Sequence, residues 1–356
     1  MSDAPMSDAL MSDALMADAS DSLVREQATK GVKPNVILSV ENLKIHFPIY
    51  GGFLQREVSS VKAVDGVSFE VHEGETLGLV GESGCGKSTT GLAVLRMLPV
   101  TSGRIVFEGI DITHHDQNQM RPIRRRMQMV YQDPFGSLDP RMSVGEIIAE
   151  PLEIHKLHGR RAERRERVMQ LLEMVGLRHD MIDRYPHQFS GGQRQRISIA
   201  RALAVEPRLL ICDEPVSALD VSIQAQVVNL FQELQEKLGI SSIFVAHDLA
   251  VVRHVSQRIA VMYLGTIVEV STRDELYANP KHPYTKALMA AIPVANPEIE
   301  AERVHQTITG EVPSAQRPPS GCRFHPRCIH AMPICKEKVP ELRPEGNSTV
   351  ACHLYS

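Results

Sequence analysis

Residues 81–89, Gly-Glu-Ser-Gly-Cys-Gly-Lys-Ser-Thr, fit the pattern G-x-x-x-x-G-K-[ST] at every fixed position. The apolar run at 76–80 before them is typical of a buried strand, and the apolar residues of 89–98 recur with helical spacing. A strand, a glycine-rich loop and a helix in this order are the context in which the pattern binds phosphate. The stretch therefore predicts a nucleotide-binding protein, and disfavours a glycine-rich turn that holds a lysine by chance.

The residue types of this loop indicate how it would hold a nucleotide. Glycines let backbone N–H groups approach phosphates closely, and the helix that follows presents its positive end to them. We expect Lys87 to reach the outer phosphates and the Ser88 hydroxyl to ligate Mg²⁺. The other nucleotide-binding residues of the loop are predicted to be Gly81, Ser83, Gly84, Cys85, Gly86 and Thr89.

The composition, 43% hydrophobic and 23% charged, is typical of a globular protein with a sizeable core. A net charge of −4 gives no overall basic field for nucleic acid, so we expect no nucleic-acid partner. No apolar run reaches the roughly 18 residues of a transmembrane helix. Residues 1–35 begin with an acidic low-complexity repeat and lack the regions of a secretory signal. We expect a disordered tail on a protein that stays in the cytosol.

Two adjacent carboxylates stand at the end of another predicted strand. The apolar run at 209–213 ends on Asp213, which is suited to binding Mg²⁺, and Glu214 is placed to polarise a water. Without a phosphate loop in the chain, a plain strand-ending turn would be the better interpretation. With it, the pair favours a role in phosphoryl chemistry.

Polar residues at other element ends complete the candidate site. Ser190 can cap a helix, and Gly191 and Gly192 expose its first N–H groups, which makes a second anion-binding helix start. Gln132 and His247 each follow a predicted strand. Strands alternate with helices along the chain, so we expect an α/β sheet with much parallel pairing.

One aromatic residue upstream of the loop could stack on the base. Phe47 is the candidate, Tyr50 and Phe53 compete with it, and an ordinary core position is equally compatible with each.

Together these motifs resemble the ATP-binding-cassette ATPases over roughly residues 36–270. The loop at 81–89 is similar to Walker A, Gln132 to the Q-loop, and Ser190 to Gln193 to the family signature, although Phe189 stands where leucine is usual. The strand at 209–213 with Glu214 resembles Walker B and the catalytic glutamate. Residues 217–220 resemble the D-loop, and His247 the switch histidine.

The resemblance implies a fold and a mechanism. The fold is a P-loop cassette with a RecA-like core, an antiparallel β subdomain and a helical subdomain at about 133–206. Two cassettes would sandwich ATP, each offering its signature to the nucleotide on the other's Walker A. Glu214 would orient the attacking water, His247 would hold the γ-phosphate, and Gln132 would sense Mg²⁺ and couple to a membrane partner beside residues 131–138. The residues implied at the shared nucleotide are Ser190, Gly191, Gly192, Gln193 and Asp220.

Residues 271–356 carry a narrower resemblance. The runs 282–285, 321–328 and 351–354 look like the C-terminal extension of oligopeptide and dipeptide importer ATPases, and 213–225 leans toward the second of their two ATPase subunits. This implies a second ATPase, two permeases and an extracytoplasmic binding protein as partners, at the cytoplasmic face of the plasma (inner) membrane. Importers of nickel, opines or glutathione share this ATPase type. A soluble cassette ATPase without permeases is the alternative from another class.

Four of the six cysteines fall in the final 35 residues, a segment poor in apolar residues. A segment with few apolar residues needs a disulfide or a bound metal to stabilise it, and four thiolates suit zinc or an iron–sulfur cluster. The spacing resembles that of the [4Fe-4S] site of some peptide-importer ATPases, so we expect a small Cys-rich domain with such a cluster; zinc, or free or disulfide-bonded thiols, are the alternatives. The predicted ligands are Cys322, Cys328, Cys335 and Cys352.

Overall fold

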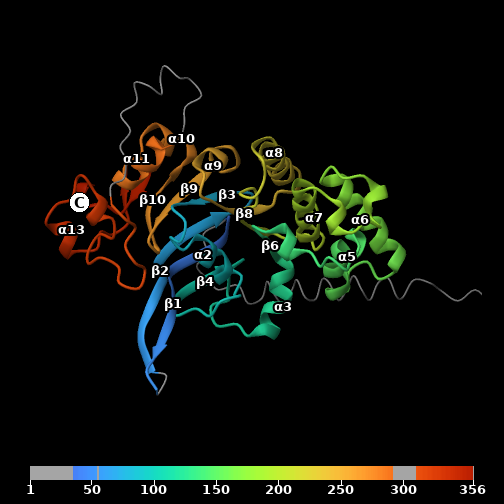
Figure 1. The fold of residues 1–356 in the computed structure, drawn as a ribbon, viewed down its shortest axis with the longest axis horizontal. Coiled ribbons are helices and arrows are strands. Elements are labelled where there is room, and N and C mark those ends of the chain that lie inside the picture. The colour runs from blue at the N-terminus through green and yellow to red at the C-terminus, as the bar shows by residue number, and fades with distance from the viewer. Residues whose placement is uncertain (1–34, 54–55, 292–309, 356) are drawn as a thin grey trace, which may run out of the picture.

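The structure, a computed structural model, describes residues 35–53, 56–291 and 310–355. The predicted disordered tail at 1–35 lies almost wholly outside these residues. Two sheets and a group of helices make up the described chain (Figure 1).

The larger sheet has eight strands in the order β11-β12-β10-β9-β3-β8-β7-β6. Strands β9, β3, β8, β7 and β6 are parallel to one another, whereas β10, β12 and β11 continue the sheet in antiparallel pairing. Because parallel strands end at the same sheet edge, the segments after β3, β6, β7 and β8 meet there. The strand bounds are β3 Thr76–Val80, β6 Met127–Val130, β7 Leu209–Asp213, β8 Ser241–Ala246, β9 Arg258–Tyr263, β10 Thr266–Thr272, β11 Arg343–Glu345 and β12 Ser348–Val350.

The smaller sheet is antiparallel, with the order β2-β1-β4-β5. Its strands are β1 Val36–Gly51, β2 Arg56–His72, β4 Ser102–Phe107 and β5 Ile110–Asp111. Strand β1 continues through Pro48, which lies opposite Ser60 of β2. Past Lys44, β1 pairs with β2 alone, so the missing N–H of proline falls on an edge strand and costs no ladder bond.

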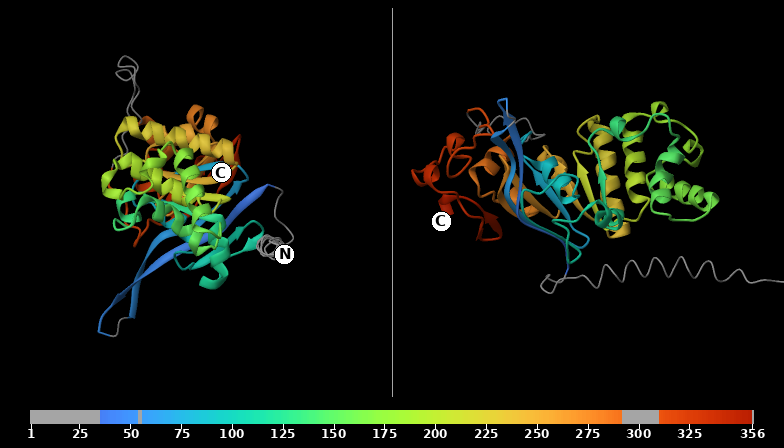
Figure 2. Two further views of the ribbon diagram at one scale, coloured as in Figure 1. Left: turned by 90° about the vertical axis from the view of Figure 1, so that its right-hand side faces the viewer. Right: turned by 90° about the horizontal axis from the view of Figure 1, so that it is seen from below.

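Helices cover the sheets and form a separate group. The region 144–177 contains two helices, α5 and α6, because Lys156 and His158 adopt left-handed backbone angles between them. Figures 1 and 2 show α5, α6 and α7 grouped at one end of the molecule. The helix bounds are α2 Lys87–Val94, α3 Gln117–Arg126, α4 Pro134–Ser137, α5 Val144–Ile154, α6 Arg161–Met174, α7 Gly191–Leu203, α8 Val221–Leu238, α9 Leu249–Val255, α10 Arg273–Ala278, α11 Pro283–Ala290 and α13 Ile334–Glu337. Four single 3-10 turns are η1 His179–Met181, η2 Pro186–Gln188, η3 His325–Arg327 and η4 His353–Tyr355.

The core lies on both faces of the larger sheet. Alternate residues of β3 point to opposite faces, so Leu77 and Leu79 pack with the antiparallel sheet and α2, while Val80 packs toward the helices. Both faces of β3 and β7 are buried along their whole length. This burial fixes the sheet edge at which the phosphate loop and the two carboxylates emerge.

The C-terminal extension is part of this architecture, and a separate Cys-rich domain is not confirmed. Its strands β11 and β12 complete one side of the larger sheet, where β12 pairs with β10 and β11 is the edge strand. Phe324 is 3% exposed and belongs to the same core cluster as the helices. The extension lies at the end of the molecule opposite α5 and α6 (Figure 2).

Candidate functional site

The phosphate loop connects β3 to α2 and has room only for glycine at two positions. Gly86 has a φ of 107°, and a Cβ there would lie 2.2 Å from the Ala63 carbonyl oxygen. A Cβ at Gly81 would lie 2.1 Å from the Met262 carbonyl oxygen. Side chains cannot enter these places, so the loop keeps the close backbone turn that exposes N–H groups to an anion.

Lys87, the first residue of α2, lies folded within the loop. Its side chain is 4% exposed, and Nζ donates to the carbonyl oxygens of Gly81 at 2.8 Å and Glu82 at 3.1 Å. Burial raises the pKa of the Cys85 thiol, whose sulfur lies 3.8 Å from Nζ. Cys85 therefore remains a neutral thiol, and its backbone N–H donates to the Glu82 carbonyl oxygen at 3.2 Å.

The predicted magnesium ligands of the two motifs meet. The Ser88 hydroxyl donates to Oδ1 of Asp213 at 2.7 Å, although the residues are 125 positions apart. Asp213 is 8% exposed, and burial raises its pKa. A hydroxyl and a carboxylate oxygen beside a phosphate loop are hard donors of the kind Mg²⁺ prefers, so these residues fit that ion.

Two more predicted residues, Gln132 and His247, converge on the carboxylate of Glu214. Nε2 of Gln132 donates to Oε2 of Glu214 at 3.0 Å, and Nδ1 of His247 lies 3.5 Å from the same oxygen. Glu214 has a φ of 43°, a left-handed backbone conformation that is uncommon for a residue other than glycine. Loops after β6, β7 and β8 thus bring Gln132, Glu214 and His247 together.

The signature residues lie on a different part of the molecule. Ser190 caps α7, and its hydroxyl accepts from the N–H of Gln193 at 3.4 Å. A Cβ at Gly192 would lie 2.4 Å from Ile223 of α8, the helix that Asp220 begins. In Figure 1, α7 lies beside α8 and the helical group, on the far side of the sheet edge from α2. The structure does not gather these residues with the loop of the same chain.

The aromatic candidates for base stacking are all exposed. Phe47 is 38%, Tyr50 58% and Phe53 102% exposed, so the alternative of a core position fails for each. No contact among the described residues distinguishes the three aromatics as stacking residues, so Phe47 stays a prediction.

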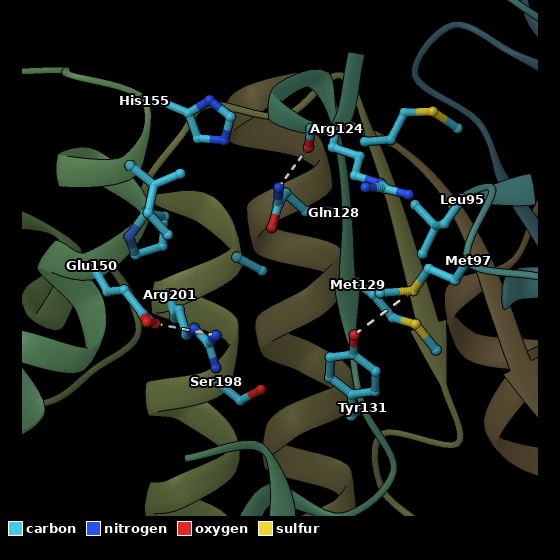
Figure 3. A pocket seen from close by; sticks show the side chains of 14 residues that line it. Leu95, Met97, Arg124, Gln128, Met129, Tyr131, Glu150, His155, Ser198 and Arg201 are labelled. Carbon is cyan, nitrogen blue, oxygen red and sulfur yellow. Dashed lines mark hydrogen bonds and ion pairs between the residues drawn. The ribbon is translucent and has the colours of Figure 1, made fainter. Parts of the chain in front are cut away.

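A groove of about 400 Å³ lies between the sheet and the helical group (Figure 3). One wall carries Met97 and Tyr131, and the other carries Glu150 and Arg201, which form an ion pair at 3.3 Å. Tyr131 directly precedes Gln132 in the chain. The groove therefore ends next to the residue that contacts Glu214.

Sequence reasoning missed two residues of the C-terminal extension that contact Glu82 of the phosphate loop. Arg327 forms an ion pair with Glu82, and the Tyr284 hydroxyl accepts from the N–H of Glu82 at 2.9 Å. A signal existed: Glu82 is an acid within a loop built to bind anions, so it needs a nearby cation. Its partner lies 245 positions away, and no spacing rule connects the two.

The predicted iron–sulfur cluster is not supported, and neither is zinc. Among the residues that the structure describes, no group of three or more His, Cys, Asp or Glu side chains could hold a metal ion. The four cysteines are free, and burial raises the pKa of Cys322 to about 11 and also that of Cys328 and Cys352. The expectation rested on a segment without a core, but this segment shares the core of the larger sheet.

No helix in the described part of the chain is both long and apolar enough to span a membrane.

Comparisons with known proteins agree with this geometry. Residues 64–217 match the model of the ABC transporter family, and residues 268–335 match that of the oligopeptide/dipeptide transporter C-terminal region. The chain is 53% identical to the oligopeptide transport ATP-binding protein AppF of Bacillus subtilis, over 90% of this chain and 98% of that protein. It is 52% identical to OppF of Escherichia coli, which carries the same description, over 91% and 97%.

Solved structures extend the likeness to the fold. A dimeric ATP-binding cassette in a post-hydrolysis state, bound to ADP and Pi, has a TM-score of 0.60 and 29% identity, over 66% of this chain and 98% of its own. The cbiO1 protein of Clostridium perfringens, part of an ABC transporter complex, has a TM-score of 0.60 and 30% identity, over 69% and 92%. The chain belongs to the ATP-binding proteins of the ABC transporter family, and it is an ABC-type ATPase with the C-terminal region of the oligopeptide/dipeptide transporters.

Proposed function

We propose that this chain hydrolyses ATP to energise the import of dipeptides and oligopeptides through an ABC transporter. The observation that carries the proposal is the meeting of Ser88 with Asp213, and of Gln132 and His247 with Glu214, at the end of one phosphate loop. The peptide substrate rests on the AppF and OppF relatives, whose printed names are oligopeptide transport proteins.

The chain's own residues bind and orient the reactants. Lys87 exchanges its two carbonyl acceptors for the outer phosphates, and the loop N–H groups bind the inner ones. Bound Mg²⁺, held by Ser88 and Asp213, would supply positive charge against the β- and γ-phosphates. Glu214 accepts a hydrogen bond from the attacking water, and Gln132 and His247 fix that carboxylate from two sides. The remaining proposed contacts to the nucleotide come from Phe47 and from the loop residues Gly81, Ser83, Gly84, Cys85, Gly86 and Thr89.

A second cassette completes the site. The signature at Ser190–Gln193 stands at the start of α7, which Figure 1 shows apart from α2, so in this proposal it serves the nucleotide of a partner together with Asp220. The partner's signature serves this chain's loop in turn. We assign the partner as a second ATPase subunit, in line with the second-ATPase motifs at 213–225.

The groove of Figure 3 is the proposed docking place for a permease. Met97 and Ile154 at its rim are 49% and 50% exposed, and exposed apolar side chains around a hollow are typical of a protein interface. A permease segment seated there would press on Tyr131 and so on Gln132. The chain would lie on the cytoplasmic face of the inner membrane, and peptide would reach the permeases from an extracytoplasmic binding protein.

The test is ATP-driven peptide uptake by vesicles that contain the two permeases, both ATPases and the binding protein. Glu214→Gln should keep parental affinity for ATP but slow hydrolysis and uptake at least about hundredfold, because it removes the acceptor for the water proton. Lys87→Ala should weaken ATP binding itself. Glu233→Gln, which changes an exposed acid of α8, is the matched control and should leave both rates unchanged. Parental hydrolysis by the Glu214→Gln complex would overturn the assignment, and uptake of nickel, opine or glutathione in place of peptide would overturn the substrate.

A further inference from the structure

Glu82 is the only acid in the phosphate loop, and it is held at three points. Its carboxylate accepts two hydrogen bonds from Arg327, at 2.8 and 3.1 Å. Its N–H donates to the Tyr284 hydroxyl at 2.9 Å, and its carbonyl oxygen accepts from Lys87 at 3.1 Å. The first two contacts come from the C-terminal extension, and the third comes from the lysine that reaches for phosphate.

The two extension residues are themselves fixed by packing. Arg327 ends the turn η3 and is 9% exposed, with its guanidinium 5.9 Å from the centre of the Tyr263 ring. Tyr284 is fully buried, and its ring lies 4.7 Å from that of Tyr263 and 5.4 Å from that of Phe324. Both side chains that contact Glu82 are therefore packed against a buried aromatic cluster, which holds them in place independently of the phosphate loop.

The charges give these contacts a consequence for nucleotide binding. An acid in the loop repels the phosphates that the loop is built to hold, and a bidentate guanidinium offsets that charge. The N–H of Glu82 is in turn held by the Tyr284 hydroxyl. Without these contacts, Glu82 would be free to turn toward the phosphates and to draw its carbonyl away from Lys87.

We propose that Arg327 and Tyr284 are positioning residues of the nucleotide site, through which the C-terminal extension holds the phosphate loop in its ATP-binding shape. The extension is then part of the ATPase machinery, and nucleotide affinity depends on how it is seated. The inference rests on the proposed binding of ATP to this loop.

The experiment measures the affinity of the full-length chain for the non-hydrolysable analogue AMP-PNP with Mg²⁺, by calorimetry. Arg327→Gln should weaken binding about tenfold, the factor that corresponds to about 1.4 kcal/mol. In a Glu82→Gln background the same change should cost less than about twofold, because no acid remains to be offset. Such a dependence of the Arg327→Gln effect on residue 82 would indicate positioning, because a general loss of stability would not depend on the charge of residue 82.

Arg323→Gln is the matched control. Arg323 is the other arginine by which the extension forms an ion pair with the cassette, but its partner is Asp65 of β2. Its loss should change the affinity less than about twofold, within the range of independent sites. Equal losses in Arg323→Gln and Arg327→Gln, or a loss that persists in the Glu82→Gln background, would overturn the proposal.

A second pair of variants tests the tyrosine without removing a charge. Tyr284→Phe keeps the ring and should speed hydrogen exchange at the amides of residues 82–87 in the nucleotide-free chain. Tyr277→Phe also loses a buried hydroxyl contact, to the Leu249 carbonyl, and should leave that exchange unchanged. Unchanged exchange in Tyr284→Phe with parental affinity in Arg327→Gln would refute the inference. A parental chain that binds no AMP-PNP would instead refute the proposed function, and the inference with it.

Discussion

His282 and Glu269 show how burial sets the charge of single residues beside the phosphate loop. The N–H of His282 donates to Oε2 of Glu269 at 2.8 Å, and its Nδ1 accepts from the N–H of Tyr284 at 3.0 Å. His282 is 1% exposed, and burial lowers its pKa to about 3. Burial raises the pKa of Glu269. The histidine is therefore neutral in the folded chain, and it orients the start of α11, which carries Tyr284.

The depressed pKa of His282 makes the fold sensitive to acid. Between an unfolded pKa of about 6.5 and the folded value, the unfolded chain binds a proton that the folded chain refuses. This residue should therefore cost up to about 1.4 kcal/mol of unfolding free energy for each pH unit below 6.5. His282→Asn keeps an acceptor for the Tyr284 N–H and does not titrate.

The measurement is the melting temperature from pH 7 to pH 5. It should fall less steeply in His282→Asn than in the parental chain, and the raised pKa of Glu269 is common to both proteins. Parallel curves for the two proteins would show that His282 does not remain neutral when folded.

Single residues also show how far the site could be predicted. Lys87, Ser88, Asp213 and Glu214 were identified because local patterns fix their positions at element ends, and sheet order alone brings such ends together. Arg327 could not be predicted from the sequence, because its ion pair with Glu82 depends on how the C-terminal extension packs against the phosphate loop. The cysteine prediction, which the structure does not support, counted ligands and took no account of the burial in a shared core that orders the segment.

At the scale of elements, the helix α7 begins with the signature residues, which in the proposed mechanism contact the nucleotide of a partner cassette. Ser190 and Gln193 form a capping box, in which each side chain bonds to the other's backbone N–H. Ser143 and Glu146 form the same box at the start of α5, outside the signature. The two helices therefore offer a matched comparison between capping and catalysis.

Ser190→Ala and Ser143→Ala should each cost about 1 kcal/mol of unfolding free energy through the lost cap. Only Ser190→Ala should slow ATP hydrolysis by the assembled complex, at least about tenfold, since only that hydroxyl faces a partner's nucleotide. Binding of ATP to the isolated chain should be unchanged in both. Equal hydrolysis by the two complexes would remove Ser190 from the catalytic site.

Element boundaries were the least predictable part of the fold. Proline is rare within strands, yet β1 continues through Pro48 because its outer portion pairs with β2 alone and an edge strand tolerates proline. Buried apolar side chains of α5 and α6 belong to one core, yet the helices are separated at Lys156 and His158, whose backbone angles are left-handed. Apolar periodicity reports which face is buried, and it cannot report where the chain turns.

At the scale of the whole molecule, the catalytic residues and the signature occupy separate surfaces. Figure 1 shows α2 and α7 on different parts of the chain, and the extension at the end farther from the helical group. In the proposed mechanism, a single copy therefore holds two half-sites and no complete one. Hydrolysis should depend on a partner cassette, and the extension and groove should make it depend on the transporter.

The central claim is tested most directly by comparing ATP hydrolysis by the monodisperse monomer with hydrolysis by the complete importer, at equal concentrations of sites. The monomer should bind ATP but hydrolyse it at least about tenfold more slowly, because no signature faces its phosphate loop. A strictly monomeric preparation that hydrolyses ATP at the rate of the importer would contradict the account.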